Sequence, residues 1–242
     1  MKNFLALTRR ELGVYFVSPM AYIILTVLLL IAGAIFVSSI GYFAANQLAV
    51  DYAPTLFCIM VIIVFSSALV TMRLIAEEKS KGTLEIILTA PISDVTFVLA
   101  KFAAAMVLLA YLLLLTVGYL VIISRYGNVD FGAVASGYLG VFILGAVMYS
   151  IGLFISSLCA NQITAGVITF AVAAMLALAN LSANLFAETS PVRAFLAYVD
   201  LMVNFGDFLK GVVDRTRLVY LLSLTFFFLF LTTRVVESRR WR

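Results

Sequence analysis

Long apolar segments separated by short polar breaks dominate this sequence. A helix needs about 20 predominantly apolar residues to cross the hydrocarbon core of a bilayer, and the pattern predicts six such spans. They are expected at residues 22–42, 56–72, 98–123, 138–158, 165–185 and 218–233. The chain is therefore predicted to be an all-α, multi-pass integral membrane protein with one transmembrane domain over residues 1–242.

The fourth and fifth spans are predicted from a single uninterrupted run. No charged residue occurs between Phe131 and Ala187, and this run is too long for one transmembrane helix. Only the polar residues 159–162, Cys-Ala-Asn-Gln, divide it. We therefore expect a helical hairpin with a tight turn at this position.

Residues 3–16 predict an amphipathic helix before the first span. With successive side chains about 100° apart, one arc carries apolar residues and the opposite arc carries basic ones. The apolar arc contains Phe4, Leu5, Leu12, Tyr15 and Phe16, and the basic side contains Arg9 and Arg10. Such a helix should lie in the headgroup plane. The alternative is that its basic residues serve only as a topology signal.

Residues 73–101, here called the charged loop, separate the second and third spans. Each charge would cost about 2.5–3.5 kcal/mol inside lipid, so the loop should lie in water at one membrane face. The helix of the second span is expected to continue through Glu78 and to end at Gly82, because glycine is common just past a helix end.

A short cytosolic helix is expected next, over residues 84–89 of the charged loop. Thr83 is predicted to cap it, Glu85 lies in its first turn, and Pro91 should end it. Its apolar face would contain Leu84, Ile87 and Leu88, and Ser93 or Asp94 would cap the third span. The alternative is a solvated connecting loop, although a passive link needs only a few residues.

Basic residues set the predicted orientation. The two termini and the charged loop fall on one side of a six-span topology and hold eleven Lys and Arg residues, against five on the other side. The positive-inside bias places both termini and the charged loop in the cytosol. The formal net charge of +4 fits this bias and requires no nucleic-acid partner.

Catalytic and metal-binding motifs are missing from the sequence. It contains no histidine, no G-x-x-x-x-G-K-[ST] phosphate loop and no acidic pair inside a predicted span. We expect no cofactor or metal bound by this chain and no catalytic residues of its own. An enzyme acting on lipid within the membrane is therefore disfavoured, and energy for any active process should come from a partner.

Polar and small residues inside the spans are sparse. Gly152 lies with Gly145, Ser156 and Ala160 on a small-residue face of the fourth span, which is typical of close helix packing, and Ser150 is a polar residue of the same span. Asn180 and Asn184 lie one turn apart near the end of the fifth span. Ser150, Gly152, Asn180 and Asn184 are candidates for lining a substrate path or for interhelical packing.

The charged loop resembles the permease subunits of ABC-2-type transporters, most closely the branch associated with gliding motility. The residues that match are Arg73, Glu77, Glu78, Lys79, Gly82, Thr83, Leu84, Glu85, Leu88, Pro91 and Lys101. A second match covers residues 208–214 and 220–225 together with the closing Arg240 and Trp241. The resemblance extends over essentially the whole chain.

This resemblance implies a transporter built from several subunits. Two permease subunits, either two copies or a copy with a paralogue, would work with two ATP-binding cassette subunits that bind ATP and magnesium. The ATPase-coupling residues would be those of the charged loop from Arg73 to Pro91, and residues 2–16 would form the interfacial helix. A bacterial inner-membrane exporter is implied, in the gliding branch with an auxiliary membrane component.

Two alternatives remain open within this resemblance. The chain could be a membrane scaffold or assembly subunit of an ATPase-containing complex that opens no path. It could also belong to an exporter of the haem- or copper-maturation type, although the lack of histidine argues weakly against direct metal handling. The cargo is not encoded in any feature of the sequence.

Overall fold

The computed structural model describes residues 2–46, 51–85, 92–125, 129–179 and 200–240. Every regular element in these ranges is a helix and no strand occurs among them, which confirms the predicted all-α class. The helices are α1 (Lys2–Val17), α2 (Pro19–Ala45), α3 (Ala53–Thr71), α4 (Ala76–Ser80), α6 (Asp94–Ile123), α7 (Phe131–Leu158), α8 (Gln162–Ala177), α11 (Leu201–Leu209) and α12 (Arg215–Arg240).

Five helical segments in the described residues are long and apolar enough to cross a membrane. They contain α2, α3, α6, α7 and α12, and correspond to the first four predicted spans and the last. The helix at the fifth predicted span, α8, has 16 residues, which at 1.5 Å per residue is shorter than the hydrocarbon core. Residues 180–199 lie outside the described residues, so a sixth span is not confirmed.

Polar caps extend the helices beyond the apolar runs. The Ser93 hydroxyl accepts a hydrogen bond from Thr96 N–H, and the Asp130 carboxylate accepts from Gly132 and Ala133 N–H. The third and fourth predicted spans therefore begin four and seven residues earlier as helices than as apolar segments. The Asn161 side chain caps α8, which confirms the predicted hairpin turn between α7 and α8.

Helix α7 is the centre of the bundle. Most of its side chains are buried, and it packs against α3, α6, α8, α11 and α12. Close approach depends on its glycines: a Cβ at Gly145 would lie 2.5 Å from a Leu109 methyl carbon, and one at Gly152 would lie 2.1 Å from Thr71 Oγ1. The predicted packing role of this small-residue face is therefore visible in the structure.

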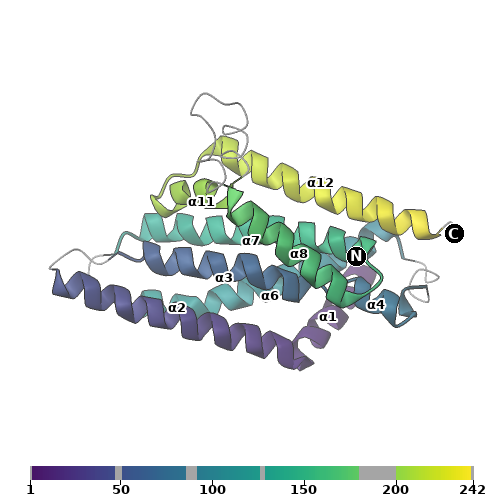
Figure 1. Cartoon of the computed structure of the whole chain (residues 1–242), viewed down its shortest axis with the longest axis horizontal. Coiled ribbons are helices and arrows are strands. Elements are labelled where there is room, and N and C mark those ends of the chain that lie inside the picture. The colour runs from purple at the N-terminus through teal and green to yellow at the C-terminus, as the bar shows by residue number, and fades with distance from the viewer. Residues whose placement is uncertain (1, 47–50, 86–91, 126–128, 180–199, 241–242) are drawn as a thin grey trace.

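Both chain termini and α4 lie at the same end of the bundle (Figure 1). The C-terminal end of α2 and the N-terminal ends of α3 and α7 lie at the opposite end, together with α11 (Figure 1). The spatial grouping of the termini with the charged loop is the one that the basic-residue pattern requires.

Candidate functional site

The second span does not continue as one helix into the charged loop. Helix α3 ends at Thr71, residues 72–75 form a turn, and α4 then runs from Ala76 to Ser80. The Ser156 hydroxyl of α7 causes this break, because it accepts hydrogen bonds from the N–H groups of Ile75 (3.1 Å) and Ala76 (3.0 Å). The prediction of a continuous helix through Glu78 was therefore wrong.

Lys79 fastens α4 to the C-terminal end of α7. Its ammonium donates hydrogen bonds to the Ser157 carbonyl and, at 3.1 Å, to the Cys159 carbonyl. The last carbonyls of a helix have no hydrogen-bond donor within the helix and carry partial negative charge. A cation at this position therefore supplies both a donor and a compensating positive charge. The short α4 is thus joined to the central helix by two side chains, Ser156 and Lys79.

Lys101 of α6 is the most unusual charged residue of the described structure. Its side chain is 1% exposed, and its ammonium lies 2.9 Å from Glu78 Oε1 of α4 and 3.2 Å from Glu11 Oε1 of α1. It also lies 5.1 Å from the centre of the Phe97 ring. We call Glu11, Glu78 and Lys101 the ion trio. It ties three elements together at the end of the bundle that holds the termini.

Helix α1 makes further polar contacts with the same region. The Tyr15 hydroxyl donates to the Val70 carbonyl of α3 (3.0 Å), and Arg73 donates to the Ser18 hydroxyl (2.9 Å) just after α1. Burial, and then the nearby Glu11 carboxylate, raise the pKa of the Tyr15 phenol well above its ordinary value, so it remains a neutral donor. The amphipathic start of the chain is therefore part of the site.

The face that α4 and the following turn present to solvent is polar. Ser80, Lys81, Gly82 and Glu85 are exposed, and Lys81 pairs with Glu77 at 2.6 Å. Gly82 has a φ of 68°, a left-handed conformation that favours glycine, which confirms the predicted break. We call residues 80–85 the exposed turn.

Two predicted contact residues of the charged loop are not on this surface. Leu84 is 5% exposed and packs in the core, and Glu78 is engaged with Lys101. The prediction that they face a partner directly was wrong. A helix begins at Thr83, whose hydroxyl donates to the Glu78 carbonyl (3.3 Å). Ile87, Leu88 and Pro91 lie outside the described residues.

The predicted apolar arc of α1 divides into two parts. Leu5 and Phe16 are exposed, as are Arg9 and Arg10, while Phe4 and Leu12 are partly buried. The side packed on α6 instead contains Leu7, Thr8 and Glu11. The sequence prediction did not include Glu11, because the arc was defined by apolar residues alone. A carboxylate among apolar positions was the signal that was available.

Of the four residues predicted to line a path or to pack between helices, the structure describes two. Ser150 is fully buried and its hydroxyl donates to the Val147 carbonyl of its own helix, and Gly152 contacts Thr71. Gly152 therefore lies at a close contact between α7 and α3, and Ser150 is buried within the bundle. Asn180 and Asn184 lie outside the described residues.

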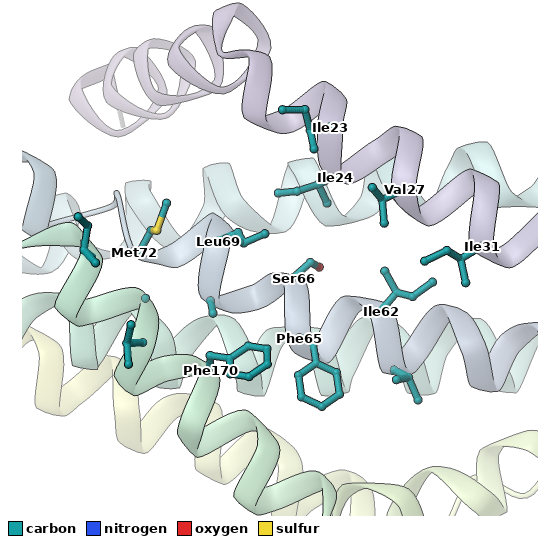
Figure 2. Close-up of a pocket in the computed structure, with 15 residues that line it drawn as sticks. Ile23, Ile24, Val27, Ile31, Ile62, Phe65, Ser66, Leu69, Met72 and Phe170 are labelled. Carbon is teal, nitrogen blue, oxygen red and sulfur yellow. The ribbon is translucent and has the colours of Figure 1, made fainter.

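A groove of about 640 Å³ opens between α2, α3 and α8. Figure 2 shows its wall of apolar side chains, among them Ile24, Leu69 and Phe170. Its one polar side chain, Ser66, donates its hydroxyl to the Ile63 carbonyl of its own helix. Among the described lining residues only the Ser66 oxygen can accept a hydrogen bond, so the groove suits hydrocarbon or another membrane helix better than a hydrated solute.

Comparison with protein families gives a match over most of the chain. The family model described as "ABC-2 family transporter protein" matches residues 43–233, which is most of the chain. The match begins near the end of α2 and ends within α12, so it includes the exposed turn, Glu78 and Lys101 of the ion trio, and the central helix α7. No curated protein matches the chain.

Proposed function

The chain belongs to the ABC-2 family of transporter proteins, and on this premise we propose that it is the membrane permease subunit of an ATP-driven exporter. ATP and magnesium would be bound by a separate ATP-binding cassette subunit, so this chain would itself be no enzyme. The exposed turn would be the docking site for that subunit. The single observation that best supports this role is the ion trio, which connects the turn's helix to α1 and α6.

The proposed coupling is mechanical. α4 is held by Ser156 and Lys79 to α7, and by Glu78 to Lys101 of α6 and so to α1. Since packed interiors deform little, a displacement applied to residues 80–85 should move these helices together. Docking contacts would come above all from the exposed Glu85, and also from the exposed Lys81 and the partly exposed Glu77. Leu84 and Glu78 would transmit force from inside.

The proposed setting is the bacterial inner membrane, with six spans and both termini cytosolic. The bias of basic residues supports this orientation, and so does the position of α1, α4 and both termini at one end (Figure 1). Helix α1 would lie at the inner interface, its exposed Leu5 and Phe16 toward lipid and its arginines toward headgroups. The fifth span, proposed at residues 165–185, would contain most of α8.

A second permease copy or a paralogue would complete the membrane part, with the path between the two. Membership of the gliding-motility branch, with an auxiliary membrane component, rests on the resemblance of the charged loop alone. The alternative is a non-transporting scaffold of an ATPase complex, of the gliding-motility or the haem- and copper-maturation type. Stimulated ATP hydrolysis distinguishes a working permease from a scaffold.

A crosslinking experiment tests docking and orientation together. A photoreactive amino acid at Ser80, in the exposed turn, should crosslink to a nucleotide-binding subunit in intact cells. The matched position is Lys210, which is also exposed but lies after α11 at the opposite end. We expect no such product from Lys210. A product at Lys210 and none at Ser80 would refute both the orientation and the docking site.

A further inference from the structure

A second groove, of about 550 Å³, lies between the start of α6 and the second half of α12. Its apolar part includes Leu99, Phe226 and Phe230, and its polar part includes Asp94, Arg234 and Glu237. None of these residues belongs to the ion trio or to the exposed turn. The groove therefore requires an explanation separate from the coupling site.

The groove has the polarity of a lipid molecule. Along α12, Phe226 and Glu237 are 11 positions apart, or about 16 Å at 1.5 Å per residue. The aromatic residues lie toward the interior of this span, and the charges lie near its C-terminal end. On α6, Asp94 is at the helix start and Leu99 lies more than one turn further in. The charged ends of both helices are at the end of the bundle that holds the termini (Figure 1).

The charges indicate which headgroup fits. Arg234 Nη1 lies 2.7 Å from Glu237 Oε2, and the guanidinium carbon is 4.9 Å from the centre of the Phe230 ring. Arginine has five donors in a planar fork that suits phosphate oxygens, so several remain for a ligand. Among the described residues that line the groove, two are carboxylates and one is a guanidinium, so a ligand that brings a cation beside its phosphate is favoured over a purely anionic one.

We propose that this groove binds a phospholipid with a zwitterionic, primary-ammonium headgroup, namely phosphatidylethanolamine. Its phosphate would contact Arg234, its ammonium would contact Asp94 and Glu237, and one acyl chain would lie along Leu99, Phe226 and Phe230. The acyl chain leaves hydrocarbon for an apolar groove and so gains no hydrophobic transfer energy, and it contributes through van der Waals packing against these side chains. The headgroup contacts determine which lipid is preferred. The lipid would come from the membrane leaflet next to the exposed turn.

The test measures which lipids stay bound to the purified full-length chain. The protein is equilibrated with equal amounts of phosphatidylethanolamine, phosphatidylcholine and phosphatidylglycerol in detergent, and bound lipids are counted by native mass spectrometry. We expect phosphatidylethanolamine to dominate. Glu237→Gln should reduce its preference over phosphatidylglycerol by about fivefold. The matched acid control, Asp51→Asn, is exposed and lies outside the groove, so it should leave the lipid preference unchanged.

A second pair of variants tests the chain-binding part. Leu99→Trp should fill the groove and remove the retained lipid, and its side chain is 41% exposed, so the fold should tolerate the change. Leu114→Trp is the control, because Leu114 is on the same helix, is 66% exposed and does not line the groove. Equal retention of the three lipids, or unchanged lipid binding by Leu99→Trp, would overturn the proposal. Finding a protein helix in the groove instead of lipid would also overturn it.

Discussion

Replacing Lys101 with methionine should destabilise the protein by about 3–5 kcal/mol, the cost typical of removing one partner from a buried ion pair. Lys101 is 1% exposed and is the cation between Glu11 and Glu78. Without it, two carboxylates remain close together with little access to water. We expect α1 and α4 to detach from α6. Denaturant titration in detergent micelles, followed by circular dichroism, measures the loss.

Two comparison variants show whether the loss comes from unpaired charge. Lys81→Met removes a lysine whose side chain is 64% exposed, and an exposed pair is worth at most about 1 kcal/mol. The triple variant Glu11→Gln, Glu78→Gln, Lys101→Met removes all charge from the ion trio and should recover most of the lost stability. The explanation would be wrong if Lys101→Met cost no more than Lys81→Met.

Substituting Gly152 with alanine should destabilise the contact between α3 and α7. The new Cβ would lie 2.1 Å from Thr71 Oγ1 and 2.7 Å from Thr71 Cβ, so the two helices would have to separate. Overpacking of a tight interior costs about 1–3 kcal/mol. Because α4 follows directly after α3 and is hydrogen-bonded to α7, this separation should also disturb the coupling site. The same unfolding titration measures the effect.

Gly118→Ala is the control for Gly152→Ala. Gly118 is also within a membrane-spanning helix, and no atom lies within 4 Å of a Cβ built there. Alanine at this position should leave stability unchanged or raise it slightly, because glycine is the poorer helix former. Adding Thr71→Gly to Gly152→Ala should recover part of the loss. A Gly152→Ala variant as stable as Gly118→Ala would contradict the close packing of α3 on α7.

Local signals in the sequence correctly predicted much of the fold. The length of the apolar segments correctly predicted the spans that contain α2, α3, α6, α7 and α12. The helix cap at Ser93 and the helix break at Gly82 were predicted from the chemistry of single residues. These features depend on residues a few positions apart. The end of α3 was not predicted from these local signals, because it depends on a hydrogen bond from Ile75 to Ser156, which lies 81 positions later in the chain.

The candidate site was predicted less completely, for a related reason. The charged loop was recognised as a unit, but charge alone did not show which carboxylates face solvent. Glu78 was expected on the surface and is paired with Lys101, while Glu85 is exposed as expected. Lys101 lies near the start of an apolar span, and its second partner, Glu11, lies 90 positions earlier in the sequence. Only the fold shows that these two residues are in contact.

Stimulated ATP hydrolysis tests the proposed coupling most directly. The chain is reconstituted in nanodiscs with the ATP-binding subunit that crosslinks at Ser80, and hydrolysis is compared with and without the permease. Glu85→Lys reverses an exposed charge of the exposed turn and should remove most of the stimulation while the protein still inserts at normal levels. Lys210→Glu, an exposed charge reversal at the opposite end, should stimulate like wild type. Wild-type stimulation by Glu85→Lys would contradict the coupling role of the exposed turn.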